Sequence, residues 1–174
     1  MTQKLSATTN VVTLDPATKP AGAVDAADAL VLANGYVPNS IAVDPSWAGT
    51  LRTARVDSVS AGDNGGARLY PNFMLSTAVS ELEGHRASVS RTVGAKNVAA
   101  TDTNIAGFDG DFSAIRWGIQ RAIGLEVIEY GDPDGQGDLK RNNQVAFRAE
   151  VIYGWGIADL AAFTKVEHAA AVEG

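Results

Sequence analysis

The sequence contains no cysteine, which excludes a disulfide framework, a thiolate metal site and a cysteine nucleophile. Histidine is scarce as well, because His85 and His168 are the only two in the chain. Neither belongs to an HExxH helix, and no GxSxG elbow accompanies them. We expect both side chains on the surface, since His85 falls in a turn and His168 near the chain end. We therefore predict that the protein is not an enzyme and takes no cofactor.

Long apolar runs are also missing. No run approaches the roughly 18 apolar residues of a membrane span, and the opening MTQKLSATTN lacks the apolar region of a signal peptide. Lys and Arg number 14 against 20 Asp and Glu, so the net charge is −6. This charge repels polyanions at long range. We predict synthesis in a cytoplasm, no membrane partner and no specific nucleic-acid partner.

Glycine and apolar residues are plentiful, with 18 glycines and 45% hydrophobic content in 174 residues. This composition fits one globular domain, or two packed subdomains, rich in turns and sheet. One helix is predicted from Asp25 to Asn34-Gly35 and a second from Asp44-Pro45, because Asp caps helix starts, Pro suits the first position and Gly ends a helix. Short strands are predicted at 40–43, 68–73, 80–82 and 87–93. Residues 1–22 are interpreted as a tail or linker.

A β-hairpin is the main expectation for the second half of the chain. The segment from Gly107 to Tyr130 opens with turn-forming residues, among them Asp109 and Asp111, and continues as extended chain. Apolar residues alternate with polar ones before and after the loop 131–142, which predicts two half-buried strands. The alternating residues are Ile123, Leu125 and Val127, then Val145, Phe147, Ala149, Val151 and Tyr153. Near the end, Leu160, Phe163 and Val166 lie three apart and suggest a helix.

The hairpin loop holds the sharpest metal candidate. Asp132, Asp134 and Asp138 partly satisfy the calcium-loop template, although position twelve is Asn143 and the flanking segments are strands. We interpret this segment as an acidic turn and keep weak calcium binding as the alternative. The Gly154–Asp159 segment imitates a dinucleotide fingerprint, but Asp159 replaces the third glycine and too few residues follow.

Charged side chains of both signs lie along the predicted hairpin. Two interpretations stay open: cross-strand ion pairs, or charge matching between subunits. The set consists of Arg116, Arg121, Arg148, Glu126, Glu129 and Glu150. The tryptophans Trp47, Trp117 and Trp155 are interpreted as core or interface anchors.

Several motifs follow one another in a recognisable order. GYVPNSIAVDPSWAGTL is followed by LYPN and LEGHRASVS, and then by GDFS, QVAFRAE and an aromatic-Gly segment that closes in AAF. Together, over roughly residues 23 to 167, they resemble the C-terminal part of the tailed-phage major capsid protein family, which has the Hong Kong 97 fold.

The resemblance implies an α+β fold with four parts. These are a tail at 1–22, an axial subdomain at 23–105 with a central sheet flanked by helices, a central strand and peripheral β-hairpin at 106–168, and a tail at 169–174. It also suggests a brief strand near Thr164 in place of the helix. By the resemblance the protein is a homo-oligomeric shell subunit of a phage or prophage virion, made in the bacterial host and assembled into pentamers and hexamers.

The resemblance further implies subunit contacts, with scaffold or portal proteins as other partners. The contact residues that we predict are Asp63, Asn64, Arg68, Arg116, Arg121, Glu129, Asp132, Arg148 and Trp155. Family members are usually longer, with an N-terminal arm, a protruding hairpin and a spine helix before the matching part. We therefore expect a fragment or a truncated prophage product. The alternatives are an encapsulin-type compartment shell and a β-rich module that binds calcium or another ligand.

Overall fold

The computed structural model describes residues 4–14, 20–56, 66–75, 80–94, 103–133 and 135–169, without the side chains of residues 20, 21 and 121–123. The chain forms two units, one of Met1–Ala114 with Ile157–Gly174 and one of Ile115–Gly156. Residues 106–114 therefore belong to the larger unit.

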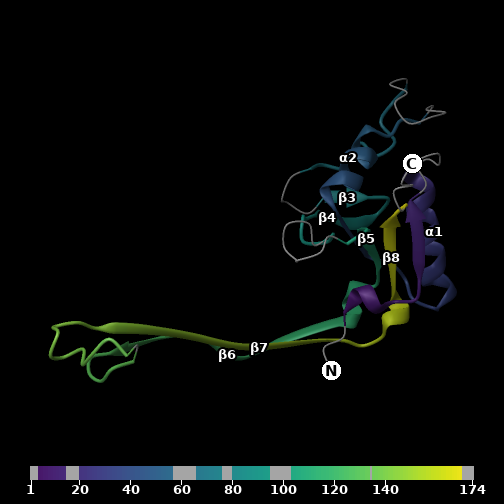
Figure 1. Ribbon diagram of the computed structural model, residues 1–174. Coiled ribbons are helices and arrows are strands. Elements are labelled where there is room, and N and C mark those ends of the chain that lie inside the picture. Colours follow the sequence, from purple (N-terminus) through teal and green to yellow (C-terminus); the bar gives the residue numbers. More distant parts are fainter. Residues whose placement is uncertain are drawn as a thin grey trace, which may run out of the picture. The chain divides into compact units, whose positions relative to one another are not determined.

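The first unit is built on a mixed six-stranded sheet in the order β1-β8-β5-β2-β4-β3 (Figure 1). The β1–β8 and β2–β4 pairs are parallel, and the remaining pairs are antiparallel. The strands are β1 (Val11–Leu14), β2 (Ser40–Val43), β3 (Ser80–Leu82), β4 (His85–Val89), β5 (Ile105–Gly110) and β8 (Phe163–His168). The first and last strands of the chain, β1 and β8, are thus neighbours in the sheet.

Helix α1 (Pro20–Ala33) begins upstream of the start predicted at Asp25. Proline lacks only an N–H that the first turn leaves unpaired, so it is well suited to this start. The predicted end is confirmed: Gly35 has a φ of 82°, its N–H donates to the Leu32 carbonyl at 2.9 Å, and the Tyr36 N–H donates to the Val31 carbonyl at 3.2 Å. These two bonds form a Schellman motif, which satisfies carbonyls that the helix itself leaves open.

Helix α2 (Pro45–Thr53) begins where the sequence predicts it. The Trp47 N–H donates to Asp44 Oδ1 at 2.8 Å, and Asp44 is almost fully buried. Its side chain therefore caps the helix in a place that water reaches poorly.

Replacing Asp44 with alanine removes this cap, and we expect the free energy of unfolding to fall by about 1 to 2 kcal/mol. Urea denaturation followed by far-UV circular dichroism measures the change. The matched control is Asp25→Ala, because Asp25 is exposed in the interior of α1 and caps nothing there. An Asp25→Ala variant as destabilised as Asp44→Ala would contradict the assignment.

Both helices pack against the sheet and contribute to one apolar core. The register aligns Ala87, Ile41, Asp109 and Thr164 in one row across β4, β2, β5 and β8. This row faces α1, since Thr164 Oγ1 donates to the Ala27 carbonyl at 3.2 Å. Asp109 therefore lies in the middle of a sheet face that is otherwise occupied by apolar and small side chains.

Gly107 allows α2 to approach the sheet. A Cβ atom at this position would lie 2.5 Å from Trp47 Cζ3 and 2.9 Å from the Ala42 carbonyl oxygen. Real Cβ atoms do not approach other atoms so closely, so glycine is needed where the indole crosses β5. The predicted turn at Gly107 is wrong because these residues form a strand.

Several local predictions are corrected by the sheet. Within the predicted tail 1–22, β1 pairs with β8. The predicted strand 68–73 is reduced to one isolated bridge between Arg55 and Arg68, while β4 begins earlier than predicted. The turn at Glu83 and Gly84, with φ values of 50° and 84°, is confirmed. The ambiguous C-terminal segment is a short 3-10 helix, Leu160–Ala162, followed by β8.

The second unit consists of β6 (Ile115–Ile128), all but the last residue of β7 (Ala146–Ile157) and the connection between them. The two strands form a separate two-stranded sheet and run side by side, with the connection at one end (Figure 1). The predicted hairpin is thus confirmed. The predicted half-burial is wrong, because nearly every described side chain of β6 and β7 is exposed. No helix among the described residues has the length and apolar character of a membrane span.

Candidate functional site

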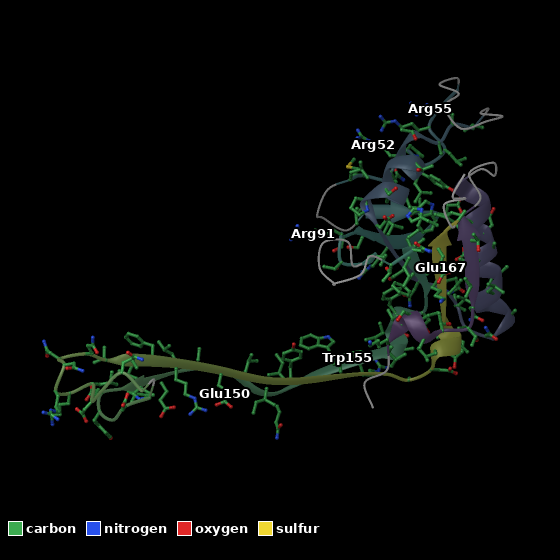
Figure 2. The ribbon with its side chains drawn as sticks, in the orientation of Figure 1. Arg52, Arg55, Arg91, Glu150, Trp155 and Glu167 are labelled. Carbon is green, nitrogen blue, oxygen red and sulfur yellow. The ribbon has the colours of Figure 1, made fainter. Side chains whose placement is uncertain are left out.

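Exposed apolar side chains gather on the hairpin (Figure 2). Among the described residues, 11 of the 17 exposed large hydrophobic residues belong to Ile115–Gly156. They are Trp117, Ile119, Leu125, Val127, Tyr130, Val145, Phe147, Val151, Ile152, Tyr153 and Trp155. Trp117 is 73% exposed and Phe147 is 64% exposed. The alternation that predicts a strand therefore leaves its apolar residues in solvent.

Such a surface is unfavourable for an isolated chain. Covering a large apolar side chain stabilises a protein by about 1.5 to 3 kcal/mol, and a two-stranded hairpin is marginally stable at best when nothing packs on it. Contiguous exposed apolar surface on a protein marks an interaction site. The chemistry of this hairpin is therefore that of a contact surface.

The hairpin also carries most of the predicted contact residues. Arg116, Glu129, Asp132, Arg148 and Trp155 are exposed on this unit. Arg68 is exposed on the first unit. Asp63 and Asn64 lie outside the described residues, and of Arg121 only the backbone, in β6, is described.

Among the side chains that the structure describes, the predicted set contains an ion pair between Arg148 and Glu150. Arg148 Nη2 donates to Glu150 Oε2 at 2.9 Å. Both residues belong to β7, so this pair runs along one strand rather than across two. Because Arg148 is well exposed, water screens the pair and it adds little stability.

The loop between the strands uses its acidic residues as turn formers. The Gly137 N–H donates to Asp132 Oδ1 at 3.0 Å, and the Arg141 N–H donates to Asp138 Oδ1 at 3.0 Å. Asp134, the third metal candidate, lies outside the described residues. The Asp132 and Asp138 contacts are those of an acidic turn.

Asp159 has a structural role at the start of the short helix before β8. Its Oδ1 accepts from the Ala161 N–H at 2.9 Å, and Tyr36 Oη donates to its Oδ2 at 2.7 Å. The bond to Tyr36 lowers the pKa of Asp159 and raises that of Tyr36. These contacts account for aspartate at the place where a dinucleotide fingerprint requires its third glycine.

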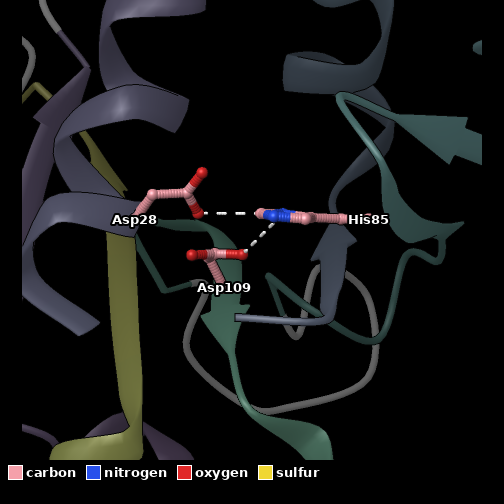
Figure 3. A group of neighbouring side chains, drawn as sticks. All are labelled: Asp28, His85 and Asp109. Carbon is pink, nitrogen blue, oxygen red and sulfur yellow. Dashed lines mark ion pairs between the residues drawn. The ribbon is translucent and has the colours of Figure 1, made fainter. Parts of the chain in front are cut away.

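A second candidate site lies in the first unit, between α1, β4 and β5. His85 Nδ1 is 3.7 Å from Asp28 Oδ1 and 3.5 Å from Asp109 Oδ1 (Figure 3). The ligand-type atoms of the three side chains all lie within 4.8 Å of one another. The elements that carry them are far apart in sequence, so the sheet and helix packing brings them together.

Asp109, at the centre of the cluster, is buried, while His85 and Asp28 are partly exposed. Asp109 is 0% exposed, and the His85 side chain is 12% exposed. Both Asp109 carboxylate oxygens, Asp28 Oδ1 and His85 Nδ1 lack a hydrogen-bond partner. Burial raises the pKa of Asp109 to about 8, and the neighbouring Asp28 carboxyl group adds to the effect.

Local sequence pattern does not predict this cluster. The sequence predicts Asp109 in a turn and His85 on the surface, and both predictions are wrong. Asp111 does shape a turn, because its Oδ1 accepts from the Ser113 N–H at 3.0 Å. The available signal is period-two alternation in HRASV, which puts His85 on the same face of β4 as the buried Ala87. The IAGFDG segment does not alternate, because nearly all of β5 is buried on both faces.

Comparisons with solved structures relate the chain to phage proteins. It is 42% identical to a chain of Mycobacterium phage Ogopogo, with a TM-score of 0.73. The match covers 96% of this chain and 56% of the phage chain. It is 37% identical to a chain of Gordonia phage Cozz, with a TM-score of 0.72. This match covers 97% of this chain and 52% of the phage chain. A structure described as the capsid of an empty GTA particle, computed with C5 symmetry, shares the fold at 19% identity and a TM-score of 0.57, over 92% of this chain and 50% of that one.

No protein-family model and no curated protein matches the chain. The chain spans about half the length of the phage chains that it matches. The matches support a relationship to the major capsid proteins of tailed phages, to which the sequence motifs also point.

Proposed function

We propose that this chain is a structural part of a phage capsid shell, and that the β6–β7 hairpin is a surface through which it contacts other copies of itself. The observation that carries the proposal is the exposed apolar surface of the hairpin. A shell subunit performs no chemical step of its own, so this role requires no catalytic site. Its location is the virion.

The proposal explains why the hairpin can be both long and uncovered. Within a shell, neighbouring copies would cover the apolar residues that solvent meets in the isolated chain. Interface cores are enriched in aromatic residues and arginine, and Trp117, Phe147, Tyr153 and Trp155 provide such anchors. We place Arg116, Glu129, Asp132 and Arg148 at the rim, where charges select the partner and the register.

Pentamers and hexamers are the assemblies that we propose. Contacts between different surface patches of identical subunits close into rings when the rotation between copies allows it. The axial and peripheral roles of the two units, the contacts of Arg68, Asp63, Asn64 and Arg121, and partnership with scaffold or portal proteins belong to the same proposal.

A phage capsid is favoured over a compartment shell because the matches at 42% and 37% identity are to phage proteins. It is favoured over a calcium-binding module because Asp132 and Asp138 each accept a backbone N–H as in an acidic turn, and the flanking segments are strands.

A charge on the hairpin should weaken self-association. We expect the double variant Leu125→Glu and Phe147→Glu to associate at least about tenfold more weakly, since buried anchors dominate interface energy and a buried unpaired charge opposes contact. Sedimentation velocity over a range of protein concentrations, with negative-stain microscopy of the same samples, measures the change.

The matched control is the double variant Leu32→Glu and Val37→Glu, which places the same two charges at residues that are 55% and 71% exposed on the first unit. It should associate like the parent chain. A parent chain that stays monomeric at every concentration, or a hairpin variant that associates as well as the parent, would count against the proposal.

A further inference from the structure

The Asp28, His85 and Asp109 side chains converge on one point inside the first unit (Figure 3). Asp28 comes from α1, His85 from β4 and Asp109 from β5. Each aims an atom without a hydrogen-bond partner at the others, and Asp109 is fully buried with both oxygens unpartnered. Buried polar groups in native proteins are normally satisfied. A group of three unsatisfied ones in contact therefore indicates a missing partner.

The distances are too long for hydrogen bonds and suit metal ligands. A charge-assisted N–H···O bond is about 2.7 to 2.9 Å long, whereas His85 Nδ1 lies 3.5 and 3.7 Å from the two aspartate oxygens. Two ligand atoms that each lie about 2.1 Å from a tetrahedral ion are about 3.4 Å apart. The two His85–aspartate distances are thus close to the separation of ligands around one cation, and all three atoms lie within 4.8 Å of one another.

The two carboxyl groups share one partner. Among the described residues, the ion-pair partner of Asp28 and of Asp109 is His85. Buried charges are normally paired or coordinate metals, and a divalent ion would let both carboxyl groups ionise while His85 stays neutral.

We propose that Asp28, His85 and Asp109 bind one divalent transition-metal ion, such as zinc, with one ligand atom from each side chain. Water would complete the coordination, as it does where a protein supplies three ligands. The ion would join α1 to β4 and β5, and so fix the packing of the helix on the sheet. The site lies in the first unit and does not depend on the role of the hairpin.

The ligand chemistry distinguishes between classes of ion. Imidazole favours zinc, cobalt and nickel over magnesium and calcium, and carboxylates accept all of them. Calcium takes six to eight oxygen ligands, which three side chains with one nitrogen do not provide. We therefore expect selectivity for transition metals.

The test is isothermal titration of the full chain, first stripped with EDTA, with zinc chloride and then with cobalt chloride. The expected result is one ion bound per chain, with loss of that binding in Asp109→Asn and in His85→Gln. Cobalt should give the visible absorption of a protein-bound ion in the parent chain, and this absorption should be missing in Asp109→Asn and in His85→Gln. Zinc should also raise the melting temperature of the parent chain by several degrees, because an ion that binds only the folded state stabilises it.

The matched control is His168→Gln. His168 Nε2 also faces a carboxylate, Asp44 Oδ2, at 3.4 Å, but no second carboxylate joins this pair among the described residues. It should bind zinc like the parent chain. Circular dichroism checks that each variant is folded, and Asp28→Asn, at a less buried ligand, provides a second test if Asp109→Asn does not fold. A parent chain without a stoichiometric site, or unchanged binding in folded ligand variants, would overturn the proposal.

Discussion

Replacing residues 115–156 with a short glycine-rich linker is expected to leave the first unit folded and to abolish self-association. None of the buried core cluster belongs to the excised segment, and the six-stranded sheet keeps all of its strands. The excision removes 11 exposed large hydrophobic residues at once. It should therefore have a larger effect on association than any point substitution.

The geometry of the excision points makes this variant practical. The Ala158 N–H donates to the Ala114 carbonyl oxygen at 2.9 Å. The residues on either side of the excised segment are therefore hydrogen-bonded to each other in the folded protein. A linker of a few residues spans such a gap, and shorter loops lower the entropy cost of closure. We expect a cooperative urea transition similar to that of the parent chain.

Light scattering and circular dichroism of the shortened chain measure mass and fold together. A monomer with native far-UV signal at concentrations where the parent associates is the expected result. A shortened chain that still associates would place the contact surface on the first unit. The excised segment alone should be largely unstructured, since a two-stranded hairpin without a covering layer is marginal in water.

Local pattern was enough to predict the hairpin and α2. Period-two alternation in β7 and the Asp44-Pro45 start of α2 depend on neighbours in the sequence, and the structure bears both out. The end of α1 at Gly35 is a local signal of the same kind. These features follow from backbone sterics and capping, which a single sequence displays.

Burial could not be predicted in the same way because it depends on distant segments. Alternation predicts that one face of β6 is covered, but the described side chains between its two end residues are all exposed. Asp109 was expected in a turn because glycines flank it, yet the register puts it between Ile41 and Thr164. Only the strand order, with β5 between β2 and β8, shows that this carboxylate is internal.

Without metal, Asp109→Asn is expected to stabilise the protein. Burial raises the pKa of Asp109 to about 8, against an unfolded value of about 3.9. Folding at pH 7 then requires the carboxyl group to take up a proton or to stay charged without a partner. Linkage puts this cost at up to about 4 kcal/mol, and an uncharged amide that can donate to Asp28 avoids it. Urea denaturation in EDTA at pH 7 measures the gain.

The direction in which stability changes with pH follows from the raised pKa of Asp109. A carboxyl group with a raised folded pKa contributes its full stability below the unfolded pKa, and that contribution is lost as pH rises towards 8. The parent chain should therefore lose stability between about pH 4 and 8 relative to Asp109→Asn, and the two should differ least in acid.

Asp111→Asn is the matched control, because the same chemical change two residues away should have the opposite effect. Asp111 Oδ1 accepts from Asn39 Nδ2 at 2.6 Å and from Ser113 Oγ at 2.6 Å, so its charge is used in the folded state. If Asp109→Asn is no more stable than the parent in EDTA, the carboxylate has a partner in solution and its burial costs little. Zinc should raise the free energy of unfolding of the parent chain and leave that of Asp109→Asn unchanged, because only the parent retains all three ligands. An equal increase in the parent chain and in Asp109→Asn would show that the stability of this region does not depend on metal binding by the three side chains.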